Sequence, residues 1–221
     1  MTVDDALLEF AREKLYAAVI CDTLDAYGLD NQSLPPEVRP LDDGLVLCGR
    51  VRTGLYMPIF HDTPEMNVYE HEIALVDDLR PGDVPVLVCG GNLRITPWGE
   101  LLSTAARARG AAGCVTDGSV RDVRQIRDMG FAVFAGGFCP LDTKGRGKLM
   151  SYDVPARVGS VAIESGDVIF GDVDGAVVVP AAAAEEVLNK AIDKVEGENA
   201  VRDELAGGTP LATVFKKYGI L

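Results

Sequence analysis

The sequence contains no apolar run of about 20 residues, the length that a membrane-spanning helix requires, although hydrophobic residues make up 48% of the chain. It is also poor in basic residues: 21 Lys and Arg are outnumbered by 34 Asp and Glu, and the formal net charge is −13. Proteins that bind nucleic acid hold its phosphates largely through Lys and Arg. We therefore expect no membrane or nucleic-acid partner, and a single domain over residues 1–221 with a sizeable core.

Cysteine and histidine are too sparse to predict a zinc site. The five cysteines follow no metal-binding spacing, and their odd number favours reduced thiols in the cytoplasm. His61 and His71, the only histidines in the sequence, lie too far apart for an H-E-x-x-H site. Asp4 and Asp5 stand where a signal peptide would carry basic residues, which also favours a cytoplasmic location.

Two glycine-containing stretches lack the residues of known ligand-binding loops. Residues 90–92 (G-G-N) do not continue into the G-x-G-x-x-G pattern, so binding of NAD or S-adenosylmethionine is not favoured. Residues 172–175 (D-V-D-G) match only a fragment of a calcium-binding loop, and a hairpin turn is the better interpretation.

The stretch from residue 90 to residue 122 carries most of the information about function. The apolar run 84–89 before it predicts a buried strand. Thr96 and Pro97 predict the start of a helix, because a threonine side chain caps free backbone N–H groups and proline needs no partner in the first turn. Residues 99–102 would then lie in that first turn, where unpaired N–H groups favour an anion.

The predicted helix ends at Gly110, and a second apolar strand follows at residues 113–116. Arg121 and Asp122 come just past the end of this strand, so a cation and a carboxylate lie side by side there. Ligands of open α/β sheets bind at that edge. We therefore expect a binding site that includes both side chains.

The order of elements predicts an α/β fold. Strands and helices alternate from residue 84 to residue 135, which indicates βαβ units and a parallel sheet. Residues 142–148 predict a flexible basic loop, and the short apolar runs after it predict hairpins in a second sheet segment. The other predicted elements are helices at 4–15, 19–27, 66–79, 123–129, 181–205 and 210–218, and strands at 45–56, 132–135, 158–163, 167–171 and 176–179.

These motifs resemble those of the RraA-like family. The resemblance rests on G-E-L-L at 99–102 and D-G-S-V-R-D at 117–122, and it extends from residue 21 to residue 175. The family includes class II 4-hydroxy-4-methyl-2-oxoglutarate/4-carboxy-4-hydroxy-2-oxoadipate aldolases and also RraA, a protein regulator of ribonuclease E. The resemblance implies an α/β/β/α sandwich of the swivelling β/β/α type, with a C-terminal helical extension from about residue 181.

The resemblance also implies roles for individual residues. In aldolases of the family, the residue matching Arg121 contacts the substrate and the residue matching Asp122 ligates the metal. The residue matching Glu100 is usually Asp and orients a metal-bound water for proton transfer, so Glu is a departure here. The implied catalytic set is Glu100, Arg121 and Asp122. Backbone amides bind the pyruvyl carboxylate, and they belong to the residues matching Gly99, Glu100, Leu101 and Leu102.

The family implies a homotrimer or homohexamer with sites between subunits. A neighbouring subunit would then contribute an acid from its C-terminal helix, for which Glu196 and Glu198 are the candidates. This part of the resemblance depends on the alignment of one helix.

The residue types themselves favour metal-assisted chemistry. Arg121 can bind a carboxylate or 2-oxo acid through two hydrogen bonds, and Asp122 offers the hard oxygen that Mg²⁺ or Mn²⁺ prefers. A Schiff base would need a buried lysine, whereas Lys144 and Lys148 lie in the predicted loop.

The sequence therefore predicts a divalent-metal-dependent lyase. It would cleave a 4-hydroxy-2-oxo acid to pyruvate and a carbonyl product, and it would decarboxylate oxaloacetate as a side activity. Two alternatives remain open: a non-catalytic regulator like RraA that binds a ribonuclease, and a lyase for another small 2-oxo acid.

Overall fold

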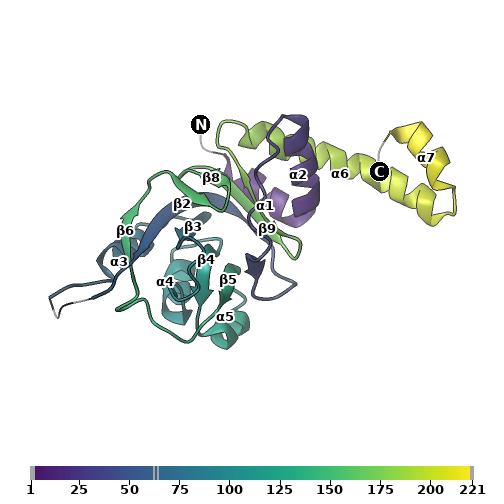
Figure 1. The fold of residues 1–221 in the computed structure, drawn as a ribbon. Helices are drawn as coiled ribbons and strands as arrows, with labels where there is room; N and C mark the ends of the chain where they lie inside the picture. Colours follow the sequence, from purple (N-terminus) through teal and green to yellow (C-terminus); the bar gives the residue numbers. More distant parts are fainter. Residues whose placement is uncertain (1–2, 62, 64, 220–221) are drawn as a thin grey trace.

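The computed structural model describes residues 3–61, 63 and 65–219, which form one large mixed sheet with helices packed against it (Figure 1). A separate two-stranded sheet pairs β7 with β8. The elements, in chain order, are α1 (Asp5–Lys14), α2 (Ala17–Ala26), β1 (Arg39–Pro40), β2 (Leu47–Pro58), α3 (Glu70–Asp77), β3 (Asp83–Val88), α4 (Glu100–Ala108), β4 (Cys114–Val120), α5 (Val123–Met129), β5 (Val133–Phe138), β6 (Gly147–Tyr152), β7 (Ala156–Val158), β8 (Val161–Ile163), β9 (Val168–Asp172), β10 (Gly175–Val179), α6 (Ala184–Ala206) and α7 (Leu211–Tyr218).

The long strand β2 joins the two halves of the sheet. The strand order is β1-β5-β4-β3-β2-β9-β10, and β6 also pairs with β2. The pairs from β2 through β3 and β4 to β5 are parallel, as the βαβ pattern predicts. On its other edge β2 pairs antiparallel with β9 over residues 47–50 and with β6 over residues 54–58. The two predicted sheet segments are therefore continuous.

The sheet curls until its two end strands approach each other. β1 contacts both β9 and β10, and the Arg39 guanidinium donates to the carbonyl oxygen of Val173 at 3.1 Å. The result is a nearly closed barrel whose interior is filled by side chains from both halves of the sheet.

Alternating side chains give each half of the sheet two buried faces. In β3, Val84 and Val86 point into the space between the two halves, while Leu87 packs under α3 and α4. In β9, Ile169 points into that same space, while Phe170 packs against α1, α2 and α6. The predicted α/β/β/α arrangement is thus confirmed, and three apolar layers hold it together.

Several predicted boundaries need correction. The helix expected at 66–79 is the shorter α3, because residues 66 and 67 have no regular structure, residues 68 and 69 form a turn, and the helix ends at Asp77. The stretch 142–148, predicted to be a flexible loop, leads into β6, which pairs with β2. The N-terminal helices agree well with prediction: Asp4 caps α1, and Gly28 ends α2 in a left-handed conformation (φ 72°).

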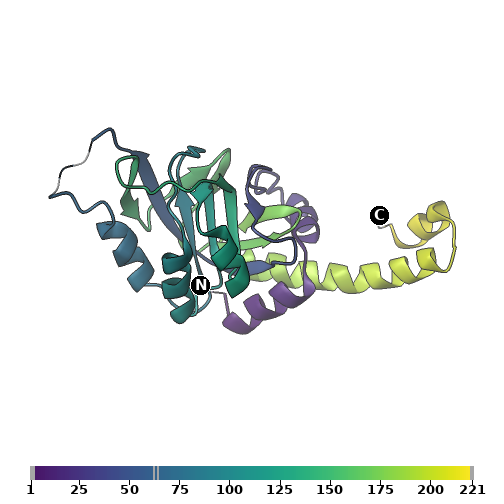
Figure 2. The ribbon, with the colours of Figure 1, turned by 90° about the horizontal axis from the view of Figure 1, so that it is seen from below.

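The C-terminal helices form an arm that leaves the body of the molecule (Figures 1 and 2). The first half of α6 buries Ala184, Val187 and Leu188 against α1, α2 and the sheet. Its second half is covered by α7, and each of these helices has a buried valine there, Val201 and Val214. The predicted helices over 181–205 and 210–218 are therefore present with shifted ends.

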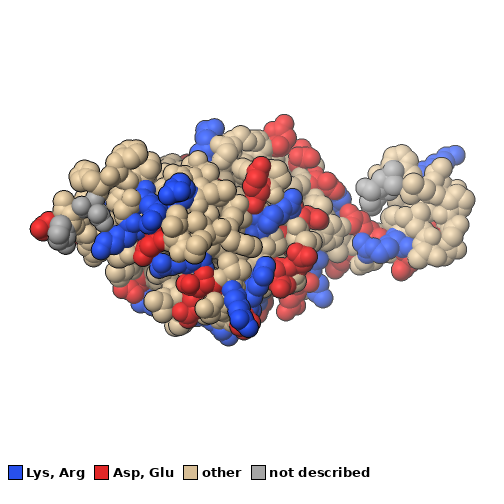
Figure 3. All heavy atoms as spheres, turned by 60° about the horizontal axis from the view of Figure 1, so that its bottom comes forward, with Lys and Arg blue, Asp and Glu red and all other residues tan. Residues whose placement is uncertain are grey.

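Charges of both signs are mixed on the face that Figure 3 shows, and no continuous basic surface is seen on it. Within the described residues, no helix is both long enough and apolar enough to cross a membrane.

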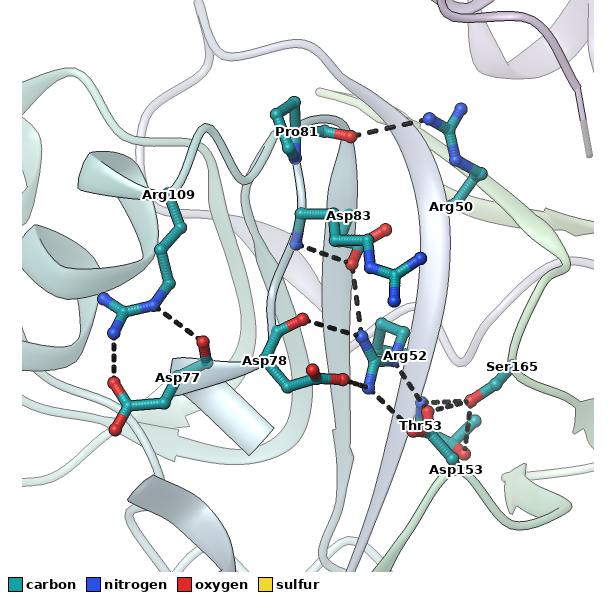
Figure 4. A network of polar contacts seen from close by, with 11 residues as sticks. Arg50, Arg52, Thr53, Asp77, Asp78, Pro81, Asp83, Arg109, Asp153 and Ser165 are labelled. Carbon is teal, nitrogen blue, oxygen red and sulfur yellow. Dashed lines mark hydrogen bonds and ion pairs between the residues drawn. The ribbon is translucent and has the colours of Figure 1, made fainter. Parts of the chain in front are cut away.

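Arg52 connects several segments at the end of the sheet where β3 begins (Figure 4). Its guanidinium binds both carboxylate oxygens of Asp153, at 2.7 and 2.8 Å, and one oxygen of Asp78 at 2.8 Å. It also reaches Asp83, the first residue of β3, at 3.4 Å. The Arg52 side chain is only 14% exposed, and these carboxylates hold its pKa above the ordinary value. One side chain thus connects β2, the turn after α3, the start of β3 and the loop after β6.

We expect Arg52→Met to lower the free energy of unfolding by about 3 kcal/mol, because it leaves the carboxylates close together without their cation. Chemical denaturation would measure the change. Arg52→Lys should fall in between, since lysine keeps the charge but loses the two-pronged contact. The control, Arg124→Met on the exposed face of α5, should change stability by less than about 0.5 kcal/mol. Equal effects of the two methionine variants would contradict the role given to Arg52.

Candidate active site

A cavity of about 230 Å³ lies at the carboxyl end of β4, and we call it the β4 cavity. Its walls come from the start of α3, the first turn of α4, the turn after β4 and the loop after β5. This is the edge of the parallel strands at which ligands of α/β proteins bind. The lining residues are Tyr69, Glu72, Thr96, Pro97, Trp98, Gly99, Leu101, Leu102, Arg121, Asp122, Asp142 and Thr143.

Helix α4 begins later than the sequence predicts. Its first residue is Glu100 and its N-cap is the extended Gly99, so the start predicted at Pro97 is wrong. The reason lies in the tertiary structure: Trp98 forms a β-bridge with Val120 and accepts the N–H of Arg121 at 3.1 Å. This pairing keeps the chain extended past the proline. Thr96 caps nothing, and its buried hydroxyl has no hydrogen-bond partner among the described residues.

The first turn of α4, which lines the cavity, contains backbone N–H groups without a carbonyl partner. The first backbone bond back along the helix runs from Ser103 to Gly99, so Leu101 and Leu102 have no carbonyl partner within the helix. The N–H of Glu100 donates to Asp122 Oδ2 at 3.2 Å. Both the amides and the positive end of the helix dipole favour an anion here.

Arg121 lies between two carboxylates. Its Nε atom is 3.8 Å from Asp122 Oδ2, and its Nη1 atom is 3.4 Å from Asp142 Oδ2. Tyr69 donates to the same Asp142 oxygen at 2.9 Å. The side chains of Arg121 and Asp122 are 38% and 40% exposed, so both remain accessible to a ligand.

The absence of a side chain at Gly99 permits this arrangement. A Cβ atom on Gly99 would lie 2.8 Å from Asp122 Oδ2, closer than real Cβ atoms approach other atoms, and 3.1 Å from Arg121 Cγ, a tight contact. Asp122 itself adopts a left-handed conformation (φ 56°), which is uncommon for a residue other than glycine. The turn and the helix end therefore fit together tightly.

The structure brings together most of the residues that the sequence singles out. Leu101, Leu102, Arg121 and Asp122 all line the β4 cavity with Gly99. The carboxylate of Glu100 is different: it accepts a hydrogen bond from Thr104 Oγ1 at 2.8 Å, one turn along α4, and Glu100 does not line the cavity.

The two acids proposed from the C-terminal helix lie on α6, away from α4 in the same chain (Figure 1). Glu198 accepts a hydrogen bond from the hydroxyl of Tyr16, and Glu196 is exposed. Within one chain, neither residue lines the β4 cavity. Their predicted contribution from a neighbouring subunit stays a prediction.

The sequence did not indicate four of the lining residues: Tyr69, Glu72, Asp142 and Thr143. Asp142 falls in the stretch predicted to be a flexible loop, and Glu72 is one of several acids on a short helix. Neither belongs to a motif. Only the tertiary fold brings α3 and the loop after β5 to the end of β4.

Burial changes the proton affinity of Glu72. It is 8% exposed, and burial raises its pKa to about 7 even though the Tyr56 hydroxyl donates to its carboxylate. The pKa of Tyr69 is raised to about 12 by burial and by its hydrogen bond to Asp142. For Asp142, burial is outweighed by the Lys144 N–H, the Tyr69 hydroxyl and the Arg121 charge, so its pKa is lowered.

Asp122 is the lining residue best suited to hold a divalent cation. One of its oxygens binds the Glu100 N–H, and the other takes no hydrogen bond from the residues described here. Across residues 3–61, 63 and 65–219, no group of three or more His, Cys, Asp or Glu side chains is arranged to hold a metal ion. Mg²⁺ commonly keeps several waters and binds through one or two carboxylates. The free oxygen of Asp122 could be one ligand of such a hydrated cation, and the metal itself stays a prediction.

Comparison with known proteins connects this chain to a family. The family model described as RraA-like, Aldolase/RraA, matches residues 17–178. DlpA of Legionella pneumophila is 30% identical over 91% of this chain, which spans 32% of the length of DlpA. A protein of Halalkalibacterium halodurans named "Putative 4-hydroxy-4-methyl-2-oxoglutarate aldolase" is 32% identical over 82% of this chain and 80% of its own length.

The fold has a match among solved structures. Streptomyces coelicolor RraAS2, described as an unusual member of the RNase ES inhibitor RraA protein family, superposes with a TM-score of 0.81 at 29% sequence identity. The match covers 91% of this chain and 98% of RraAS2.

Glu72 should make the protein less stable as the pH rises. Its folded-state pKa of about 7 lies above the ordinary 4.5, so between these values the folded protein keeps a proton that the unfolded chain releases. Glu72→Gln keeps an acceptor for Tyr56 but cannot ionise. Relative to wild type, we expect the variant to gain about 2–3 kcal/mol in unfolding free energy between pH 5 and pH 8. Urea unfolding at both pH values measures this gain.

The control is Glu70→Gln, at an exposed position on the same helix. The unfolding free energy of this control should differ from that of wild type by the same amount at both pH values. A Glu72→Gln difference that does not change with pH would contradict the raised pKa.

Proposed function

The chain belongs to the RraA-like family, and from this premise we propose that it is a divalent-metal-dependent carbon–carbon lyase. Its substrate would be a 4-hydroxy-2-oxo acid of the 4-hydroxy-4-methyl-2-oxoglutarate type, and its products pyruvate and a second carbonyl compound. Oxaloacetate would be decarboxylated through the same enolate. The similarity to the Halalkalibacterium halodurans protein supports this choice of substrate class.

One observation carries the proposal. The guanidinium of Arg121, the carboxylate of Asp122 and the free amides of the first turn of α4 line one cavity of about 230 Å³. A small 2-oxo acid needs these groups: donors for its carboxylate, a cation for its keto oxygen and a metal ligand beside both. A larger hollow of about 870 Å³ borders Arg52 and Asp153, but these side chains already bind each other.

Each group has a distinct part in the chemistry. The N–H groups of Leu101 and Leu102 bind the substrate carboxylate. Arg121 donates to the keto oxygen, where negative charge develops as the bond between C3 and C4 breaks. Asp122 would hold Mg²⁺ or Mn²⁺, which acts as a Lewis acid when bound. The exposed position of Arg121 and Asp122 lets the substrate enter.

A regulatory role is the second candidate function, because RraAS2 shares the fold. Such a protein would bind a ribonuclease through its surface and would need no metal. The resemblance implies that RraA itself lacks the metal-binding Asp after the matching arginine, so the presence of Asp122 here favours the lyase. A lyase for a different small 2-oxo acid is the remaining alternative, and Glu100 would mark that change. In each case we propose a homotrimer or homohexamer in the cytoplasm.

The first test is pyruvate release from oxaloacetate with Mg²⁺ or Mn²⁺, followed with a coupled assay. We expect a chelator to abolish the activity, and Asp122→Asn to lower kcat/KM at least about 100-fold. Arg121→Ala should also cost roughly 100-fold, or about 3 kcal/mol. Asp128→Asn and Arg124→Ala are matched controls on α5, outside the cavity, and should retain activity.

Wild-type protein that releases no pyruvate from oxaloacetate or from a set of 4-hydroxy-2-oxo acids would remove the lyase proposal. Inhibition of a ribonuclease by both the wild type and Asp122→Asn would then support the regulatory role.

Gly99→Ala tests the close fit between α4 and the turn after β4. The new methyl group would overlap Asp122 and should push the carboxylate away, so we expect a fall in kcat/KM of roughly 10-fold or more. Gly44→Ala adds the same methyl group at an exposed position with more room. If the two variants are equally active, the position of Asp122 does not depend on Gly99.

A further inference from the structure

Glu72 and Glu100 are the two candidates for the acid–base group of the β4 cavity. The structure favours Glu72, which lies outside the sequence motif. We propose that Glu72, rather than Glu100, exchanges a proton with C3 of the pyruvyl unit. This inference rests on the proposed lyase function. It concerns a residue of α3, an element that contributes nothing to the motifs G-E-L-L and D-G-S-V-R-D.

The side chain of Glu72 belongs to the cavity wall. Its Oε2 atom accepts the hydroxyl of Tyr56, a buried residue of β2. Its Oε1 atom takes no hydrogen bond from the described residues, yet it is not among the buried polar atoms left without a partner. That oxygen therefore keeps some exposed surface, and because Glu72 lines the β4 cavity together with Arg121 and Asp122, we infer that it is reached from the cavity.

Glu100 is placed less well for this step. Only its backbone N–H engages the site, through Asp122. Its carboxylate accepts the hydroxyl of Thr104, so the side chain follows the helix. The extra methylene that distinguishes Glu from Asp allows this reach to the next turn.

The surroundings of Glu72 make both of its protonation states accessible near neutral pH. Burial raises its pKa to about 7, and the charge of Asp142 adds to that effect. The Tyr56 hydroxyl and the charge of Arg121 act in the opposite direction. Tyr69, the N-cap residue just before α3, donates its hydroxyl to Asp142. A group that titrates near the working pH is the most effective general acid or base.

The proposed step conserves atoms and charge. The Glu72 carboxylate removes one proton from the methyl group of pyruvate. The C–H electron pair forms the C2–C3 double bond, and the carbonyl π pair moves onto the oxygen that faces Arg121. In decarboxylation the C3–C4 bond breaks, CO₂ leaves, and C3 receives the proton of the Glu72 carboxyl group. A proton taken up from the buffered solvent then restores the Glu72 carboxyl group. In the exchange reaction, Glu72 trades the proton it has removed for one from the solvent and delivers that one to C3.

Exchange of the pyruvate methyl protons in D₂O isolates this step, and NMR measures it on the full chain with Mg²⁺. We expect Glu72→Gln to slow exchange about 100-fold or more, and Glu100→Gln to slow it less than about 5-fold. Glu70→Gln, an exposed neighbour on α3, should leave the rate unchanged. Calorimetric titration with pyruvate should give a Kd for Glu72→Gln within about 3-fold of wild type, because the carboxylate and keto contacts remain.

The pH profile gives a second readout. Removal of a methyl proton needs the ionised carboxylate, so the wild-type exchange rate should rise as the pH passes about 7. Glu72→Gln should lose this rise, and Glu72→Asp should keep part of it.

The outcomes separate the two proposals. If Glu72→Gln exchanges at the wild-type rate while Glu100→Gln does not, the assignment is overturned and the lyase proposal stands. A loss of pyruvate binding as large as the loss of exchange also overturns it, since Glu72 would then only support the cavity. If the wild-type protein neither exchanges the methyl protons of pyruvate nor cleaves any 2-oxo acid, the lyase proposal itself is contradicted.

Discussion

The contact between the first turn of α4 and the turn after β4 determines where the groups of the β4 cavity lie. Gly99 has no side chain, so Asp122 can approach the helix and accept the N–H of Glu100. The same approach places Arg121 beside Gly99, at the start of that turn. Free backbone amides, a guanidinium and a carboxylate thus occupy one small space because two backbone segments pack without an intervening Cβ atom.

Short sequence patterns were sufficient to predict the part of the site that is formed by neighbouring residues in the chain. The strand before Arg121, the helix after Gly99 and the βαβ order could each be predicted from short runs of residues. The start of α4 could not, because pairing between Trp98 and Val120 outweighs the capping preference of Thr96. Glu72 and Asp142 reach the cavity only through the packing of distant elements, which no local pattern encodes.

The cavity gives its carboxylates different environments. Glu72 is buried against Tyr56, whereas Asp122 is exposed and already bonded to a backbone N–H. Asp142 is held by Tyr69 and by the charge of Arg121. Acids in unlike surroundings can serve unlike purposes within one site. On the proposed function, one would move protons, one would hold the cation, and one would keep the guanidinium in place.

Arg52 lies at the opposite edge of the parallel strands from Arg121, since β3 begins at Asp83 beside it. The contacts of Arg52 that hold the sheet together lie at one end of the parallel strands, and the candidate active site lies at the other end. Substitutions in the first turn of α4 and in the turn after β4 can therefore alter which ligand is accepted while the strands stay joined. Because of this division, related proteins can change or lose the reaction while they keep the same fold.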